Sequence, residues 1–268
     1  MTADRVWTDF RQLRELTPLV LCLTNSVVRE FTANALLALG ASPIMSDAAE
    51  EIVELVGIAN ALNLNIGTPT PRSSEAMEVA ARAANSRQIP LVLDPVAVGA
   101  TELRRDLVHR LLRIAGPTAI RGNQAEIAFM AGLPALARGV DAAGISDHAR
   151  VATLQLAKDL GSVIIASGPI DYLSDGNKVI ALENGHPLMP RVTGSGCVAT
   201  AVVAAFLTVD PEPLSAAISA MTVMNIAGEL AAERSGTGGP GSFRVSFLDA
   251  FDELQPEYLE QRMRASEV

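Results

Sequence analysis

A loop of small residues that leads straight into an apolar helix is the part of this sequence best suited to chemistry. The loop is Arg191-Val192-Thr193-Gly194-Ser195-Gly196-Cys197, and the apolar run Val198 to Leu207 follows it without a break. The first N–H groups of a helix lack partners inside it, and the helix dipole favours negative charge there. Glycines let an anion approach the backbone, and a thiol in the first turn has its thiolate favoured. The segment predicts an anion-binding cradle for phosphoryl transfer, with Cys197 as an acid/base group at its rim.

Taken alone, the glycine loop would also fit a plain tight turn without a binding role. Small polar residues and glycines elsewhere in the chain favour the binding role. They follow nearly every short apolar run that predicts a strand. In an open parallel sheet, ligands bind beyond the carboxyl ends of the strands, so these residues should gather at one edge. The segments are Thr24-Asn25-Ser26, Met45-Ser46-Asp47, Asn65-Ile66-Gly67-Thr68-Pro69, Asp94-Pro95-Val96, Arg121-Gly122-Asn123-Gln124-Ala125-Glu126 and Ser167-Gly168.

Two acidic residues and one arginine in these segments suit a phosphorylated ligand. Asp94 and Glu126 offer hard oxygen donors that could hold Mg²⁺ directly or through water. Asn123 and Glu126 share a face at a helix start, where they also fit a capping box, and Asp94 before a proline also fits a turn cap. Arg121 suits a phosphate group, although a surface ion pair would explain it as well.

The elements that must position these residues alternate between strand and helix, which predicts βαβ units and a mostly parallel sheet. The predicted strands are Leu19 to Thr24, Pro43 to Ser46, Leu62 to Ile66, Pro90 to Asp94, Thr118 to Arg121 and Val163 to Ser167. The predicted helices between and after them are Arg29 to Leu39, Glu50 to Asn60, Ser73 to Arg87, Glu102 to Ile114, Gln124 to Ala131 and Asp147 to Leu160.

The later part of the chain has a different pattern. The Asp175-Gly176-Asn177 turn predicts an antiparallel hairpin at the sheet edge, over Tyr172 to Ile180. After Gly196 the chain is predicted to be helical over Cys197 to Leu207, Glu212 to Arg234 and Val245 to Arg262. A glycine-rich insert, Ser235 to Gly241, separates the last two helices as a connector or a packed loop.

Composition limits the classes of function. The chain has 268 residues without a dividing linker, which fits one α/β domain over residues 1–268. A net charge of −9 argues against nucleic-acid and membrane-surface binding, which need a basic face. Two cysteines cannot make a disulfide framework and the N-terminus is too polar for a signal peptide, so we expect a cytoplasmic protein. No histidines have the spacing of a zinc site.

Taken together, these motifs resemble the hydroxyethylthiazole kinase family, thiamine-salvage enzymes of the ribokinase-like superfamily. The resemblance runs from about residue 18 to about residue 250. It is carried by Thr24 to Val28, Phe31 to Met45, Asn65 to Thr68, Leu93 to Val96, Ile120 to Ile127, Gly139 to Asp141, Asn184 to Pro187, Thr193 to Cys197 and Gly239 to Phe243.

The resemblance implies a ribokinase-like three-layer α/β/α sandwich that uses ATP and Mg²⁺ to phosphorylate the primary hydroxyl of 4-methyl-5-(2-hydroxyethyl)thiazole. It also implies a homotrimer with sites at the subunit interfaces. The residues it places against the thiazole are Met45, Gly194, Asn25, Val27, Gly67 and Thr68. It places Arg121, Ser167 and Asn123 in the ATP site and Asp94 and Glu126 at the metal, with Cys197 where related kinases carry an aspartate base.

The chain departs from the family pattern at three positions. Ser195 stands where the family more often has alanine, which should be harmless because the backbone amides of Gly194, Ser195, Gly196 and Cys197 would bind the phosphoryl group. Pro169 stands where the family commonly has an acidic residue, so this chain lacks a carboxylate for any metal or water contact at that position. Asp47 stands where an apolar residue or a histidine is expected, so the rim of the substrate pocket should differ.

Three other functions remain open on the sequence alone. A ribokinase-like hydro-lyase that repairs hydrated nicotinamide cofactors would make no phosphorylated thiazole. A thiazole- or thiamine-binding protein would bind its ligand without consuming ATP. A transferase with Cys197 as nucleophile would need a histidine base, and none has suggestive spacing.

Overall fold

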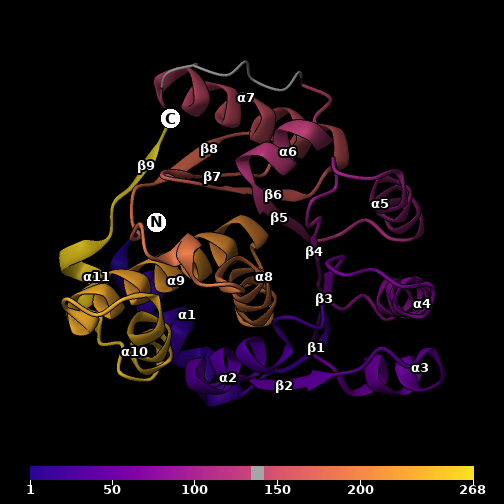
Figure 1. Cartoon of the computed structure of the whole chain (residues 1–268), viewed down its shortest axis with the longest axis horizontal. Helices are drawn as coiled ribbons and strands as arrows, with labels where there is room; N and C mark the ends of the chain where they lie inside the picture. Colours follow the sequence, from indigo (N-terminus) through magenta and orange to yellow (C-terminus); the bar gives the residue numbers. More distant parts are fainter. Residues whose placement is uncertain (134–141) are drawn as a thin grey trace.

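The computed structural model describes residues 1–133 and 142–268, and the Gly139 to Asp141 stretch of the family resemblance lies outside the described residues. The described strands form one sheet in the order β2-β1-β3-β4-β5-β6-β7-β8-β9 (Figure 1). Their bounds are β1 Leu19–Leu23, β2 Ser42–Met45, β3 Ala61–Asn65, β4 Leu91–Asp94, β5 Ala119–Asn123, β6 Val163–Ser167, β7 Asp171–Ser174, β8 Val179–Leu182 and β9 Ala265–Glu267.

The sheet is parallel from β2 to β6 and antiparallel from β6 to β9. The carboxyl ends of β1 to β6 therefore share one edge. The predicted hairpin is confirmed, since β7 and β8 pair antiparallel through Asp171↔Leu182 to Ser174↔Val179. The predicted mostly parallel sheet with an antiparallel edge is the one observed.

Helices cover both faces of the sheet and give the predicted three layers (Figure 1). On one face lie α1 Ala3–Leu16, α2 Arg29–Leu39, α8 Ser195–Phe206, α9 Pro213–Ser235, α10 Pro240–Asp252 and α11 Pro256–Arg262. On the other face lie α3 Ala49–Ile58, α4 Pro71–Arg87, α5 Glu102–Ile114, α6 Gln124–Met130 and α7 Ala142–Leu160. Alternate residues of β1 serve the two cores: Val20 and Cys22 face the first group, and Leu21 and Leu23 face the second.

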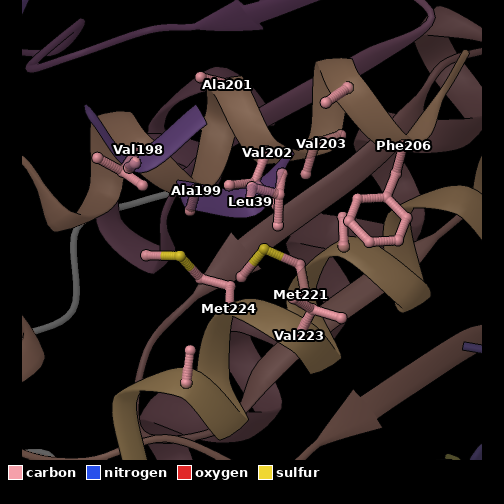
Figure 2. Close-up of a cluster of buried hydrophobic side chains, with 14 of the residues drawn as sticks. Leu39, Val198, Ala199, Ala201, Val202, Val203, Phe206, Met221, Val223 and Met224 are labelled. Carbon is pink, nitrogen blue, oxygen red and sulfur yellow. The ribbon is translucent and has the colours of Figure 1, made fainter. Parts of the chain in front are cut away.

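Helix α8 is buried on nearly all sides, which explains its continuous apolar sequence. It lies across β1, β3, β4 and β5 and packs against α2 and α9. Its Val202 and Phe206 share a cluster with Leu39 of α2 and Met221 of α9 (Figure 2). This packing fixes the N-terminus of α8 at the carboxyl edge of the sheet.

Helix α9 is long and apolar enough by composition to cross a membrane. In the structure 89% of its most apolar window is buried within the protein. Its apolar character is therefore explained by packing in the core, where it contacts α1, α8, α10, α11, β6 and β7.

The structure corrects the predicted elements at both ends of the chain. A helix over Ala3–Leu16 was not predicted, although Thr2 caps it and Val6, Phe10 and Leu13 bury one stripe of it. The single helix predicted over Val245 to Arg262 is wrong, because Pro256 cannot continue a helix and begins α11 instead. The glycine-rich insert ends earlier than predicted, since Pro240 is the first residue of α10. Strand β9 was also missed.

Candidate active site

The glycine loop forms the N-terminus of α8 and leaves backbone amides free. Gly194 is the N-cap, with φ of 97°, and no side chain caps the helix. The Ser195 N–H donates to Val192 O at 3.3 Å, and the Val198 N–H begins the helical ladder at Gly194 O. Among the described residues, the amides of Gly196 and Cys197 have no acceptor. Such amides at a helix start bind anions.

A guanidinium group lies directly over this helix start. A Cβ atom on Gly196 would lie 2.7 Å from Nη1 of Arg121, so only glycine allows the approach. The Nε of Arg121 donates to Ser167 Oγ at 3.2 Å, which joins neighbouring strands β5 and β6. A cation at the positive end of a helix is unfavourable unless an anion joins them. The predicted pair Arg121 and Ser167 is therefore brought together beside the predicted cradle.

Asp94 ends β4 as a carboxylate that is only 2% exposed. Its Oδ2 accepts hydrogen bonds from Asn65 Nδ2 at 2.6 Å and from Thr200 Oγ1 at 2.9 Å. Burial raises the pKa of Asp94 to about 7, although the nearby Arg121 charge lowers it. Asp94 and Glu126 line one cavity, which brings together the two residues predicted to hold the metal.

Glu126 and Asn123 form the capping box that the sequence left open as an alternative. Asn123 Oδ1 accepts from the Glu126 N–H at 2.8 Å, and Glu126 Oε2 accepts from the Asn123 N–H at 2.7 Å. Glu126 Oε1 accepts from the Ala97 N–H at 2.7 Å. No group of three or more His, Cys, Asp or Glu side chains that could hold a metal occurs among the described residues. This donor set still fits Mg²⁺, which is held by one or two carboxylates, waters and substrate phosphates.

These groups surround a cavity of about 720 Å³, which is large enough for a nucleotide. Of the predicted residues, the cavity wall includes Asp94, Arg121, Asn123, Glu126, Ser167 and the segment Ser195 to Cys197. The prediction missed several residues of the wall, among them Asp171, His186, Met189, Met221, Met224 and Asn225. Asn225 is a single amide in the apolar helix α9, which is the one sequence feature that marks it as a buried hydrogen-bonding residue.

Three of the residues predicted to contact the thiazole lie in neighbouring segments, and one of them, Asn25, reaches Cys197. The Nδ2 of Asn25 lies 3.4 Å from Cys197 Sγ and donates to Asn65 Oδ1 at 3.0 Å. Gly67 packs against Asn25 so closely that a Cβ there would lie 2.8 Å from Asn25 Cβ. Thr68 Oγ1 accepts from the Ser26 N–H at 3.3 Å. These contacts place the ends of β1 and β3 against the start of α8.

The cavity wall includes none of the six residues predicted to contact the thiazole. Val27 is 65% exposed, and Met45 packs at the margin of the core; neither is part of the cavity wall. Gly194 contacts Val28 and Phe31 of the neighbouring segment. At the rim, Asp47 forms an ion pair with Arg29 at 2.5 Å, which lowers the pKa of Asp47.

The environment of Cys197 opposes the predicted thiolate. Burial, followed by the nearby Asp94 charge, raises the pKa of Cys197 to about 11, even though Asn65, Asn25 and Arg121 lower it. The expectation that the helix start favours the thiolate is therefore wrong. Desolvation and the Asp94 charge outweigh the groups that favour the thiolate, and Cys197 carries its proton at neutral pH.

The layered sheet with its antiparallel edge is shared with solved kinase structures. A pyridoxal kinase from Staphylococcus aureus, solved with AMP-PCP and pyridoxal, shares this fold at a TM-score of 0.67 and 16% identity, covering 94% of this chain and 99% of that one. A hydroxyethylthiazole kinase protein from Pyrococcus horikoshii OT3 is more similar, with a TM-score of 0.90, 36% identity and 98% of both chains covered.

The sequence comparisons give the family. The model of the hydroxyethylthiazole kinase family matches residues 10–257. A hydroxyethylthiazole kinase of Cereibacter sphaeroides is 48% identical over 97% of this chain and 98% of its own, and one of Nitratidesulfovibrio vulgaris is 46% identical over 93% and 92%. The chain belongs to the hydroxyethylthiazole kinase family, and the predicted family and fold class are confirmed.

Proposed function

We propose that this chain transfers the γ-phosphoryl group of ATP to the primary hydroxyl of 4-methyl-5-(2-hydroxyethyl)thiazole, giving the thiazole phosphate and ADP in thiamine salvage. Its membership of the hydroxyethylthiazole kinase family and the names of its relatives support the reaction. The observation that carries the proposal is the pair of free amides at Gly196 and Cys197 beneath the Arg121 guanidinium. Positioning and charge neutralisation provide most of the acceleration in phosphoryl transfer.

Each group of the cavity then has a role. The α8 amides receive the charge that develops on the transferred phosphoryl group, and Arg121 with Ser167 holds the phosphate chain. Asn123 lies beside them on the nucleotide side. Asp94 and Glu126 would hold Mg²⁺, directly or through water, and the ion would neutralise charge on the phosphate oxygens. Asn25, Gly67 and Thr68 border the acceptor side next to Cys197.

The acceptor site is completed by a second copy of the chain. All six residues that the resemblance places against the thiazole lie outside the cavity wall, and the large exposed fraction of Val27 fits a position covered by a neighbouring subunit. A homotrimer with sites at its interfaces, a single kinase domain over residues 1–268 and a cytoplasmic location belong to the same proposal. The acidic net charge of −9 is consistent with small-molecule substrates rather than nucleic acid or membranes.

A coupled ADP-release assay tests the reaction. ADP should appear only when hydroxyethylthiazole, ATP and Mg²⁺ are all present, and mass spectrometry should find the phosphorylated thiazole in equal amount. Omitting the thiazole or chelating Mg²⁺ should reduce ADP release to background. ADP release without a phosphorylated thiazole would contradict the proposal and would favour a nucleotide-dependent reaction on another substrate.

Replacing Cys197 with Ser should slow turnover without abolishing it. The thiol is protonated at neutral pH, so it accepts little of the hydroxyl proton and mainly positions the acceptor with Asn25. Because general-base help is worth about 10²-fold or more, a smaller loss indicates a positioning role. We therefore expect kcat to fall by about tenfold, measured with saturating thiazole at neutral pH. Complete loss of activity in a folded Cys197→Ser protein would show that the sulfur takes part in the chemical step.

A further inference from the structure

The short turn that joins β6 to β7 is held by a buried carboxylate. Ser167 ends β6 and Asp171 begins β7, with Gly168, Pro169 and Ile170 between them. The Oδ1 of Asp171 accepts a hydrogen bond from the Gly168 N–H at 2.9 Å. Its Oδ2 accepts from Asn225 Nδ2 of α9 at 2.8 Å. Both oxygens of Asp171, which is only 4% exposed, are thus used within the turn and its support.

The other side of the same turn is also fixed. Gln124 Nε2, at the start of α6, donates to Ile170 O at 2.9 Å. A Cβ on Gly168 would collide with that nitrogen, so the glycine permits the close approach. Pro169 adds a fixed φ at the centre of the turn. The turn is therefore held between the carboxylate on one side and an amide on the other.

Burying a carboxylate costs free energy even when hydrogen-bond donors compensate for part of the cost. The presence of Asp171 at this buried position therefore requires a reason. Burial raises the pKa of Asp171, while the Asn225 and Gly168 hydrogen bonds and the Arg121 charge lower it. Asp171 has no direct ion pair with a basic residue in the described part of the chain. An apolar residue at this position would avoid the cost of burial, but it would leave the Gly168 amide without its acceptor.

The turn leads directly to the residues at the phosphate side of the cavity. Ser167 Oγ accepts from Arg121 Nε at 3.2 Å, so the position of the turn fixes the direction of the guanidinium. Asp171 and Asn225 line the same cavity as these two residues. Gly185, which also lines the cavity, lies near Asn225, with its Cβ position 3.7 Å from Asn225 Cγ. Asn225 is therefore close to both Asp171 and the Gly185 segment of the wall.

We propose that Asp171, supported by Asn225, is a positioning residue that holds the Gly168 turn so that Ser167 and Arg121 meet the phosphate chain of the nucleotide. This inference rests on the proposed placement of ATP at Arg121 and Ser167. We call Asp171, Asn225 and the Gly168 amide the clamp. In it, the buried carboxylate acts through a backbone amide rather than on the reacting groups.

Two substitutions of Asp171 in the full-length protein test the clamp. Asp171→Ala should raise the KM for ATP and the Kd for ADP, measured by titration calorimetry, by about tenfold, because the Gly168 turn loses its acceptor. The KM for the thiazole should stay within about twofold. Asp171→Asn should recover most of the nucleotide affinity, since its amide oxygen can accept from Gly168 while Asn225 turns its own oxygen toward the new amide.

A matched control separates positioning from stability. Asp9 is another fully buried carboxylate, which accepts from Ser219 Oγ of the same helix α9 at 2.6 Å and is not part of the cavity wall. Asp9→Ala should lower the melting temperature and leave the KM for ATP unchanged. If Asp171→Ala does not fold, Asn225→Ala removes the other half of the clamp and should also raise the KM for ATP.

The outcomes distinguish this inference from the proposed function. A rise in the KM for ATP in Arg121→Met, with unchanged values in the Asp171 and Asn225 variants, would overturn the clamp and leave the nucleotide site in place. Unchanged KM for ATP in Arg121→Met would overturn the nucleotide site and the clamp together. Equal losses for ATP and thiazole in Asp171→Ala would show a general structural role and would also overturn the clamp.

Discussion

Replacing Gly194 with Val should abolish turnover, with a loss of about 10³-fold or more in kcat/KM. Gly194 has a φ of 97°, a conformation that a β-branched residue strongly disfavours. Its Cβ would also lie 2.9 Å from Val28 Cγ1 and 3.1 Å from Phe31 Cδ1, both in well-packed surroundings. The first turn of α8 must shift to relieve these contacts, and the free amides would then move away from the position proposed for the phosphoryl group.

A second glycine provides the control for this prediction. Gly161, after α7, has a φ of +62° and nothing within 4 Å of its Cβ position. Gly161→Val therefore also places a β-branched residue at positive φ, with less strain than at Gly194, without a collision and away from the cavity. We expect it to lower the melting temperature and to leave kcat/KM unchanged. A folded Gly194→Val protein with full activity would refute the amide cradle, and the coupled ADP assay is the measurement in both cases.

The features that the sequence predicted well are local ones. The run from Gly194 to Leu207 contains its own glycine turn, helix start and apolar surface, so the glycine N-cap and the buried helix α8 could be predicted together. The alternation of apolar runs and amphipathic segments predicted the parallel strands for the same reason. Helix α1 has an equally local pattern in Val6, Phe10 and Leu13 and was predictable, but it was missed.

The features that escaped prediction depend on contacts between distant parts of the chain. The high pKa of Cys197 comes from burial and from Asp94, which is brought to it only by the fold. Asp171 and Asn225 are separated by 54 residues and meet across the sheet and α9. Strand β9 is three exposed residues whose pairing with β8 depends on the path of the C-terminus. None of these follows from the pattern of a short window.

Replacing Asp94 with Asn should nearly eliminate Mg²⁺-dependent activity. The amide has the same shape, and its oxygen can keep the hydrogen bonds from Asn65 and Thr200, so the fold should be retained. Only the negative charge is lost, and with it the carboxylate that we propose as a metal ligand. Because a metal contributes several kcal/mol of charge stabilisation to the transition state, we expect kcat to fall by about 10³-fold. The assay is ADP release across a Mg²⁺ titration.

The same substitution should stabilise the protein at neutral and alkaline pH when Mg²⁺ and nucleotide are absent. Burial raises the folded pKa of Asp94 from 3.8 to about 7, so the folded state binds this proton more tightly than the unfolded state does. Wild-type stability therefore falls as pH rises between these values and stays reduced above them. The amide of the Asp94→Asn protein does not titrate, so the advantage of this variant in the free energy of unfolding should grow from about pH 5 to about pH 8 in urea denaturation with EDTA.

Thr200→Val tests a hydrogen bond to Asp94 separately from the charge of Asp94. It removes the Thr200 donor but keeps the carboxylate, and the lost bond raises the pKa of Asp94 further. We expect this variant to keep measurable Mg²⁺-dependent activity and to lose stability at about pH 8, which is the reverse of Asp94→Asn on both measurements. An Asp94→Asn protein that stays Mg²⁺-dependent and active would remove Asp94 from the metal site. An Asp94→Asn protein that is inactive and less stable than wild type at about pH 8 would show that the carboxylate stabilises the fold. It would contradict our expectation that the carboxylate lowers stability in exchange for activity.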